Sequence, residues 1–181
     1  MLLSAVVGAS AAGVFAAAVG VMIISFGWYD ISASKPHGAL TAWVLHTTMI
    51  DSVRARAKYA SAPAQFSAEQ VKQGFGVFEA HCVMCHGAPG VARAKWVMGM
   101  EPTPPYLLDA ARRWSPAELR FITSHGVKMT AMPAWQLTLS PDELTSLVAF
   151  LEALPNISAK QYADMRARGS HQGARLPEGK R

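Results

Sequence analysis

Two cysteines and a histidine stand together in the segment Cys82-Val83-Met84-Cys85-His86. Two thiols with two residues between them lie about one helical turn apart, and a histidine beside the second can lie under a flat ring that both sulfurs hold. This spacing is the signature of c-type haem attachment. We therefore expect thioether bonds from Cys82 and Cys85 to one covalently attached haem c, with His86 as the proximal ligand of the iron.

The same two cysteines are also compatible with a redox-active pair or with half of a zinc site. A thioredoxin-like pair belongs beside a βαβ pattern, which the sequence lacks. A structural zinc ion needs four ligands. The chain has no third cysteine, so only scattered histidines are left to complete such a site. Haem attachment is therefore the favoured interpretation.

The sixth coordination position of the iron also needs a ligand, and the segment Gly126–Trp135 contains two methionines. A thioether is a soft, neutral ligand that stabilises reduced iron and raises its reduction potential. Met132 is the preferred candidate and Met129 the competitor. Pro133 follows Met132 directly and restricts it to extended backbone, which is a suitable way to aim a side chain steadily.

The 181 residues provide for one ordinary domain and an appendage, with a formal net charge of +5. A basic chain can bind nucleic acid, anionic lipid or an acidic protein. No DNA-reading helix or RNA-binding motif is recognisable, so no nucleic acid is expected and an acidic electron-transfer partner is preferred. Only two cysteines are present and the motif uses both, so no disulfide framework is needed.

Residues 1–29 carry no acidic or basic side chain, and the apolar run Val6–Phe26 is long enough to cross a membrane. A cleaved signal peptide is the alternative. Its apolar region is usually about 7–15 residues behind a basic start, whereas this run is longer and has no basic residue before it. We expect a retained transmembrane anchor in the inner (cytoplasmic) membrane, with Trp28 and Tyr29 at the membrane interface.

Two features of the sequence predict opposite orientations for this anchor. Lys35, Arg54, Arg56 and Lys58 follow the apolar run and nothing basic precedes it, which by the positive-inside rule places the rest of the chain in the cytoplasm. A c-type haem domain belongs on the outer side. We give the haem motif more weight and expect the domain to face the periplasm or an equivalent outer compartment.

Residues 30–66 are interpreted as a membrane-proximal helix and a linker. The helix is expected over His37–Ala60, with an apolar face and a polar end, so it suits a membrane surface or a partner subunit. His37 and His46 lie in this helix. A lone histidine is more often an ordinary polar contact than a haem ligand, and this is how we interpret both.

Residues 67–156 contain three capping boxes, each a serine followed three residues later by glutamate or glutamine. They pair Ser67 with Gln70, Ser115 with Glu118, and Ser140 with Glu143. A fourth box, Ser158 with Gln161, predicts a short helix closing near Gly169 in the C-terminal region 157–181, followed by a basic, mobile tail. No segment alternates apolar and polar residues convincingly, so an all-α fold is expected.

From about Ser67 to Pro155 the chain resembles class I monohaem cytochromes c. The resemblance lies in the helix with Gly74 and Phe78 before the haem motif, the Met-Pro loop and the final apolar helix. It implies the class I cytochrome c fold around one covalent haem, with His86 and Met132 as axial ligands. It also implies that the Gly74 helix crosses the last one and that Pro104 or Pro105 accepts the hydrogen bond of the proximal imidazole.

The anchor and His-Thr-Thr-Met at 46–49 resemble small cytochrome subunits that accompany respiratory membrane complexes. The expected function is therefore that of a one-electron carrier without a catalytic site of its own. It would link a quinol or dehydrogenase side to an oxidase or soluble acceptor, as a subunit among other membrane proteins. A haem enzyme or small-ligand binder with an open sixth site is one alternative, and a mainly structural subunit is another.

A group of basic side chains between the two axial ligands is a candidate docking surface for an acidic partner, or else an ordinary solvated surface. Its members are Arg93, Lys95, Arg112, Arg113, Arg120 and Lys128.

Overall fold

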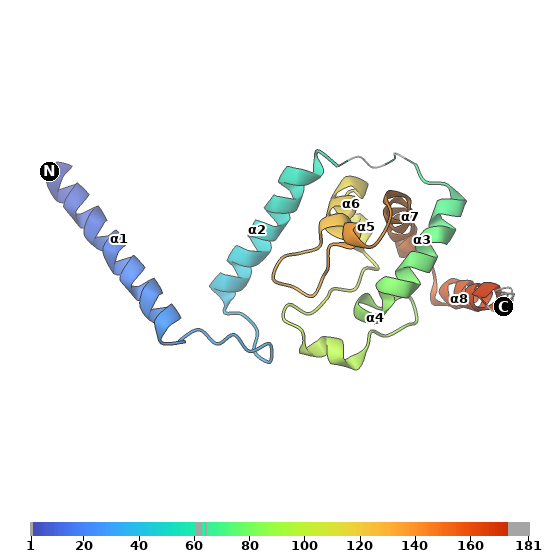
Figure 1. Cartoon of the computed structure of the whole chain (residues 1–181), viewed down its shortest axis with the longest axis horizontal. Coiled ribbons are helices and arrows are strands. Elements are labelled where there is room, and N and C mark those ends of the chain that lie inside the picture. The colour runs from blue at the N-terminus through green and yellow to red at the C-terminus, as the bar shows by residue number, and fades with distance from the viewer. Residues whose placement is uncertain (1, 61–62, 64, 174–181) are drawn as a thin grey trace, which may run out of the picture. The chain divides into compact units, whose positions relative to one another are not determined.

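Helices make up the regular secondary structure of the chain in the computed structural model, which describes residues 2–60, 63 and 65–173 (Figure 1). No strand occurs in these residues, and one isolated bridge joins Ala88 to Val91. The predicted all-α class is confirmed. Residues up to Lys35 form one unit and those from Pro36 onward form a second.

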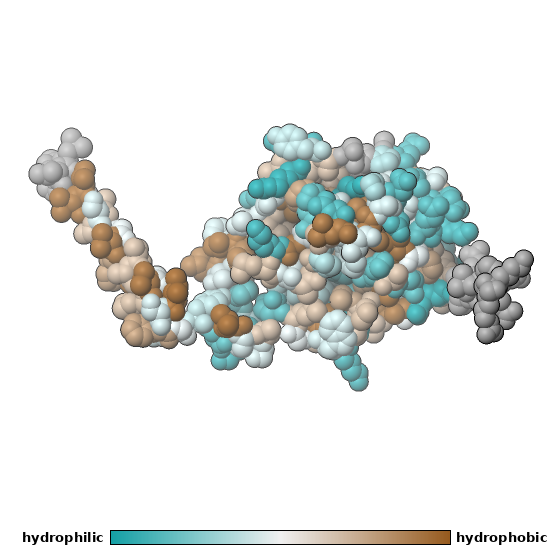
Figure 2. Space-filling model, in the orientation of Figure 1, coloured by the Kyte–Doolittle hydropathy of each residue, from teal (hydrophilic) through white to brown (hydrophobic). Residues whose placement is uncertain are grey.

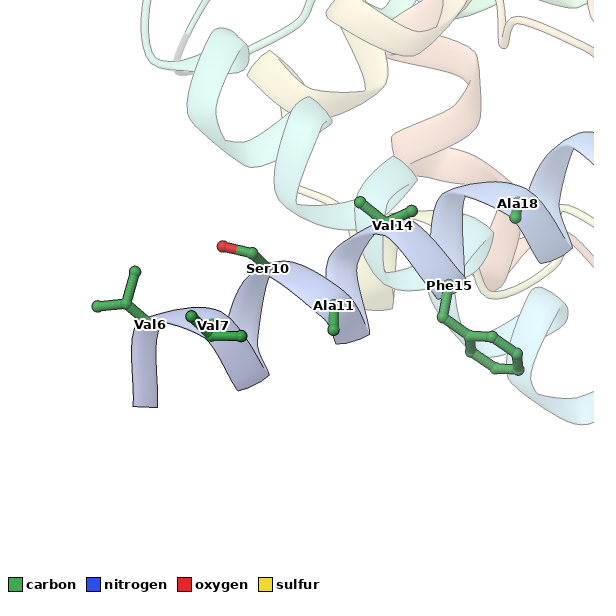
Figure 3. A pocket seen from close by; sticks show the side chains of 7 residues that line it. All are labelled: Val6, Val7, Ser10, Ala11, Val14, Phe15 and Ala18. Carbon is green, nitrogen blue, oxygen red and sulfur yellow. The ribbon is translucent and has the colours of Figure 1, made fainter. Parts of the chain in front are cut away.

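The first unit contains α1 (Leu2–Ser25), whose stretch Val6–Ser25 is long and apolar enough to cross a membrane. Figure 2 shows an apolar surface along this helix. Seven side chains between Val6 and Ala18 project from the exposed surface of this helix, and Ser10 carries the only polar group among them (Figure 3). The helix therefore has the composition expected of an anchor.

The second unit begins with α2 (Ala39–Ala57), which lies within the predicted range but is shorter at both ends. Its C-terminal half packs on α6 (Pro116–His125), where Val53 and Ala57 are buried. Arg54 Nε lies 3.9 Å from Glu118 Oε1 in the same contact. The sequence predicted that this helix contacts a membrane surface or a partner subunit. In the structure, its C-terminal end packs within the domain.

The three predicted capping boxes all form, at the starts of α3 (Ala68–His81), α6 and α7 (Pro141–Ala153). In each box the serine hydroxyl accepts from the backbone N–H three residues later, and that residue's side chain accepts from the serine N–H. A proline also stands at the start of α6 and of α7. Local hydrogen bonds therefore determine where these three helices begin.

The core of the domain lies where α3 crosses α7. Phe78 and Phe150 are fully buried with ring centroids 5.1 Å apart, and Leu147 packs in the same cluster. Gly74 provides the crossing point, because a Cβ there would overlap the carbonyl group of Ser146 and lie 2.9 Å from Phe150 Cβ. The predicted crossing at Gly74 is confirmed.

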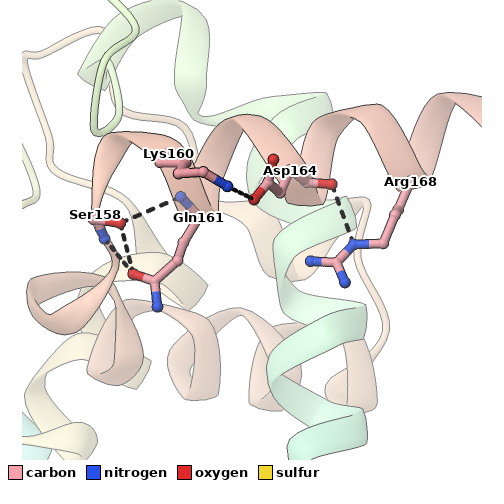
Figure 4. Close-up of polar contacts among 5 residues, drawn as sticks. All are labelled: Ser158, Lys160, Gln161, Asp164 and Arg168. Carbon is pink, nitrogen blue, oxygen red and sulfur yellow. Dashed lines mark hydrogen bonds and ion pairs between the residues drawn. The ribbon is translucent and has the colours of Figure 1, made fainter.

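The C-terminal helix α8 (Ala159–Gly173) begins at the fourth capping box, with Ser158 N–H donating to Gln161 Oε1 over 2.8 Å (Figure 4). The figure also shows Lys160 paired with Asp164 at 3.0 Å. The helix continues beyond the predicted end near Gly169. Of the predicted mobile tail, residues 174–181 lie outside the described residues.

The first turns of α8 are attached to α3 through Tyr162. This side chain is fully buried against Phe75, with ring centroids 5.4 Å apart, and its hydroxyl donates to Glu79 Oε1. Arg166 Nε donates to the other oxygen of Glu79 over 2.9 Å. The helix that follows the core is therefore an integral part of the domain.

Replacing Tyr162 with phenylalanine is expected to lower the free energy of unfolding by about 1–2 kcal/mol, because Glu79 loses a buried hydrogen-bond donor. Urea unfolding monitored by circular dichroism measures this change. As a control, Lys160→Ala removes an exposed ion pair and should change stability by less than about 0.5 kcal/mol. Equal effects of the two substitutions would contradict the assigned role of Tyr162.

The same tyrosine should make stability depend on alkaline pH. Burial and the hydrogen bond to Glu79 raise the pKa of Tyr162 above its ordinary value of about 10. A raised folded-state pKa gives stability that is present below the unfolded pKa and is lost as pH rises above it. The parent chain should therefore lose stability above about pH 10, and the Tyr162→Phe variant should lose less.

Candidate haem site

The Cys-x-x-Cys-His segment lies at the end of α3 and continues into the short helix α4 (Val83–His86). The N–H of His86 donates to the carbonyl of Cys82 over 2.9 Å, so Cys82 and Cys85 are separated by one helical turn, as predicted. Cys82 is buried and Cys85 is half-buried, and both are free thiols. The helix ends at Gly87, whose φ of 65° suits glycine.

The environment of Cys82 disfavours the two alternatives to haem attachment. Burial, with Cys85 nearby, raises the pKa of the Cys82 thiol to about 12. Redox exchange and zinc binding both use the thiolate, which is costly in this environment, whereas a thioether sulfur is uncharged. Within the described residues, no three His, Cys, Asp or Glu side chains gather as a metal site.

His86 is held by the backbone of a distant loop. Its Nδ1–H donates to the carbonyl of Pro105 over 2.7 Å, so Pro105 rather than Pro104 makes the contact, and Nε2 is left to bind a metal. Burial is the main cause that lowers the pKa of His86, and the nearby charge of Arg93 adds to it. The imidazole is therefore neutral at pH 7 and fixed in one tautomer, which suits a proximal ligand.

Arg93 secures the loop that holds His86. Its Nη1 donates to the carbonyl of Pro104, and its guanidinium carbon lies 4.2 Å from the ring centroid of Tyr106. Its Nε is buried and has no hydrogen-bond partner among the described residues. That atom is available to an acceptor on a bound group, such as a carboxylate. In the sequence Arg93 was only one of six basic residues, so this role was missed.

The loop after α6 closes on itself through backbone and hydroxyl contacts. The N–H of Val127 donates to the carbonyl of Met132 over 3.2 Å, and the N–H of Met132 donates to Thr130 Oγ1 over 3.1 Å. Met129 has a φ of 59° and an 85% exposed side chain, whereas Met132 is half-buried. The two methionines of the loop therefore differ in exposure, and Met132 is the less exposed of the two.

Four aromatic side chains that follow the Cys-x-x-Cys-His segment divide between packing and surface. Trp114 packs against the core, and Trp135 lies beside His81 with ring centroids 4.9 Å apart. Trp96 and Tyr106 keep about half of their surface exposed, 56% and 47% respectively.

Three of the six predicted docking cations already have partners within the domain. Arg93 binds Pro104, Arg112 pairs with Asp109 at 3.2 Å, and Arg120 donates to Thr145 Oγ1 over 2.6 Å. His37 and His46 join no group of metal-ligating side chains within the described residues. Half of the candidate docking cations are therefore already engaged by groups of the domain itself.

A comparison with protein families identifies the type of domain that contains these residues. Residues 69–151 match the family model described as cytochrome c oxidase, cbb3-type, subunit III. The match starts in α3, includes the Cys-x-x-Cys-His segment and ends in α7. These residues form a class I monohaem cytochrome c domain. No curated protein matches the chain.

The cytochrome c domain accounts for the central helices, while α1, α2 and all of α8 lie outside the matched residues. The match implies a covalently bound haem c in this domain, and the residues present fit that group. The fit consists of two uncharged thiols one turn apart, a neutral imidazole oriented by Pro105, and the unpaired Nε of Arg93. When bound, haem c supplies an iron that exchanges single electrons.

Replacing Arg93 with lysine should destabilise the cytochrome c domain by about 1–2 kcal/mol, because an ammonium group reproduces neither the planar fork nor the stacking on Tyr106. Hydrogen exchange of the His86 Nδ1–H should also become faster as the Pro104–Tyr106 loop loosens. Denaturant unfolding and NMR measure the two effects. Arg112→Lys, at an exposed ion pair, is the matched control and should leave both nearly unchanged.

Proposed function

We propose that this chain is a membrane-anchored one-electron carrier with one haem c. In this proposal Cys82 and Cys85 bind the haem through thioether bonds, and His86 and Met132 bind its iron. The observation that carries the proposal is the His86 imidazole, buried, neutral and oriented by Pro105 one turn from two free thiols. That arrangement lies inside a segment that matches a cytochrome c family.

The sixth ligand determines whether the chain is a carrier or an enzyme. Met132 is half-buried in a loop closed by its own backbone, and this supports Met132 over Met129 as the ligand. An iron with both axial positions filled has no site for a substrate, so its chemistry is restricted to the transfer of electrons. A methionine ligand also favours the reduced state and a higher potential.

The membrane part of the proposal rests on α1 and on the family match. Val6–Ser25 has the length and composition of a membrane span, and the matching model describes subunit III of a cbb3-type cytochrome c oxidase. We place the chain in the cytoplasmic membrane with the domain in the periplasm. There it serves as a subunit of a respiratory complex, passing electrons from a quinol or dehydrogenase side to an oxidase or a soluble acceptor.

Haem attachment is tested by maturing the chain with a full attachment apparatus and extracting the denatured protein with acidified organic solvent. The pigment should stay with the polypeptide, at one haem per chain, and a redox titration should follow a one-electron curve. The double variant Cys82→Ala, Cys85→Ala should carry no covalent pigment. Extraction of the pigment from the parent chain would refute the assignment of the two thiols.

The membrane assignment needs a separate measurement. Membranes from an expressing strain should keep the chain through a carbonate wash and release it in mild detergent, together with other membrane subunits. A chain that the carbonate wash releases would contradict the anchor without affecting the haem assignment. The identity of the co-purified subunits then determines which complex the carrier serves.

A further inference from the structure

The N-terminal half of α2 exposes an apolar surface that the domain does not cover. Leu40 and Trp43 are 73% and 64% exposed, and Val44 and Leu45 are also exposed. These four residues are called the α2 apolar surface below. From Ala39 to Ile50 the helix carries no Asp, Glu, Lys or Arg side chain, and His46 is the one titratable group in that stretch. Large exposed apolar side chains gathered in two helical turns indicate a surface that binds lipid or the apolar surface of another protein.

The chain itself keeps this surface close to the membrane, if the anchor proposed above is correct. Only 13 residues separate the end of α1 at Ser25 from the start of α2 at Ala39. A chain of that length reaches at most about 45 Å when extended and about 20 Å when flexible. The ion pair between Asp30 and Lys35, at 2.8 Å, shortens the path further. The lipid surface is therefore always within reach of α2.

The distribution of charge along α2 also suits a lipid surface. Trp43 is the residue type that prefers the membrane interface, and it lies in the uncharged half. The basic residues Arg54, Arg56 and Lys58 follow in the opposite half, where Val53 and Ala57 are packed on α6. The helix is thus divided into an apolar end without a partner and a basic end that belongs to the domain.

We infer that the α2 apolar surface inserts into the lipid interface next to the anchor. The inference rests on the proposed membrane function and goes beyond it, because it gives the domain a second attachment to the bilayer. Since α2 is also packed on α6, this second attachment restrains the whole cytochrome c domain. The domain is then held beside the membrane instead of moving freely on its linker.

The experiment measures the depth of spin labels on the full-length haem protein in liposomes that contain no other protein. The thioether bonds leave the chain without a free thiol, so a single introduced cysteine can be labelled. Leu40→Cys and Val44→Cys test the α2 apolar surface. Tyr59→Cys is the matched control, because Tyr59 follows the other end of α2 and is 81% exposed.

Oxygen concentrates in lipid and a nickel chelate stays in water, so the ratio of the two accessibilities reports depth. We expect this ratio to be several-fold higher at positions 40 and 44 than at position 59. Equal ratios at the three positions would overturn the inference and leave a protein partner as the occupant of the surface. A high ratio at positions 40 and 44 that is seen only with anionic lipid would overturn the inference too, because the basic residues would then make the contact.

A label at Phe15→Cys separates this inference from the proposed function. If the label at position 15 lies in lipid and the label at position 40 lies in water, only the insertion of the α2 apolar surface is refuted. Water accessibility at position 15 refutes the anchor and the inference that depends on it. The visible spectrum of each labelled variant confirms that the haem domain is folded in every comparison.

Discussion

Replacing Met132 with alanine is expected to lower the reduction potential of the haem protein by a few tenths of a volt, a substantial part of the roughly 0.8 V over which axial ligands set haem potentials. The thioether stabilises the reduced iron, and alanine has no atom to replace it. The absorption band of the methionine-to-iron bond should disappear from the oxidised protein. Optical redox titration and the visible spectrum measure both changes.

The matched control for this experiment is Met129→Ala, in the same loop. Met129 is 85% exposed, so its removal should leave the absorption band and the potential nearly unchanged. The opposite result, with the band lost in the Met129 variant and kept in the Met132 variant, would exchange the two assignments. A band that survives in both variants would show that neither of these two methionines is required as the ligand, and a band absent from the parent protein would remove methionine from the sixth position.

Replacing Gly74 with alanine is expected to lower the free energy of unfolding by about 3 kcal/mol or more, the upper part of the range for overpacked cores. The added methyl group would overlap the backbone carbonyl of Ser146, which cannot rotate away as a flexible side chain can. The helices α3 and α7 must then move apart, and Phe78 and Phe150 lose contact. Guanidinium unfolding of the haem protein measures the loss.

Gly76 provides a control on the same helix. A Cβ at this position meets nothing within 4 Å, so alanine there should stabilise the domain by about 0.5–1 kcal/mol through its better helix propensity. The two substitutions are chemically identical and should act in opposite directions. A Gly74→Ala variant as stable as Gly76→Ala would show that the crossing of α3 and α7 is looser than described.

Features determined by neighbouring residues were predictable from the sequence. The capping boxes at Ser67, Ser115 and Ser140 gave the starts of α3, α6 and α7, because each box is made within four residues. The helical turn between Cys82 and Cys85 follows from the same local geometry. The crossing at Gly74 came instead from the resemblance to cytochromes c.

Contacts between distant residues were not predictable in the same way. Tyr162 and Glu79 are 83 residues apart, and neither carries a local sign that they meet. Arg93 was indistinguishable from other surface cations until the structure placed it on Pro104 and Tyr106. The choice of Pro105 over Pro104 for His86 also depends on how a loop 19 residues away folds back.

The packing of α2 on α6 illustrates why an amphipathic pattern alone is insufficient. The pattern predicted one apolar face, but the structure uses Val53 and Ala57 inside the domain and leaves Leu40 and Trp43 outside. Hydrophobic periodicity reports that a face will be covered, and it does not report which neighbour covers it. Only the arrangement of the whole domain separates the two ends of this helix.

The burial of Cys82 determines the order of events during biogenesis. In the folded chain this thiol is only 6% exposed, and its raised pKa keeps it protonated. An attachment enzyme needs access to the sulfur, which the packed helices deny. If the proposed thioether forms at Cys82, the porphyrin is joined to a polypeptide that has not yet folded, and the helices close afterwards.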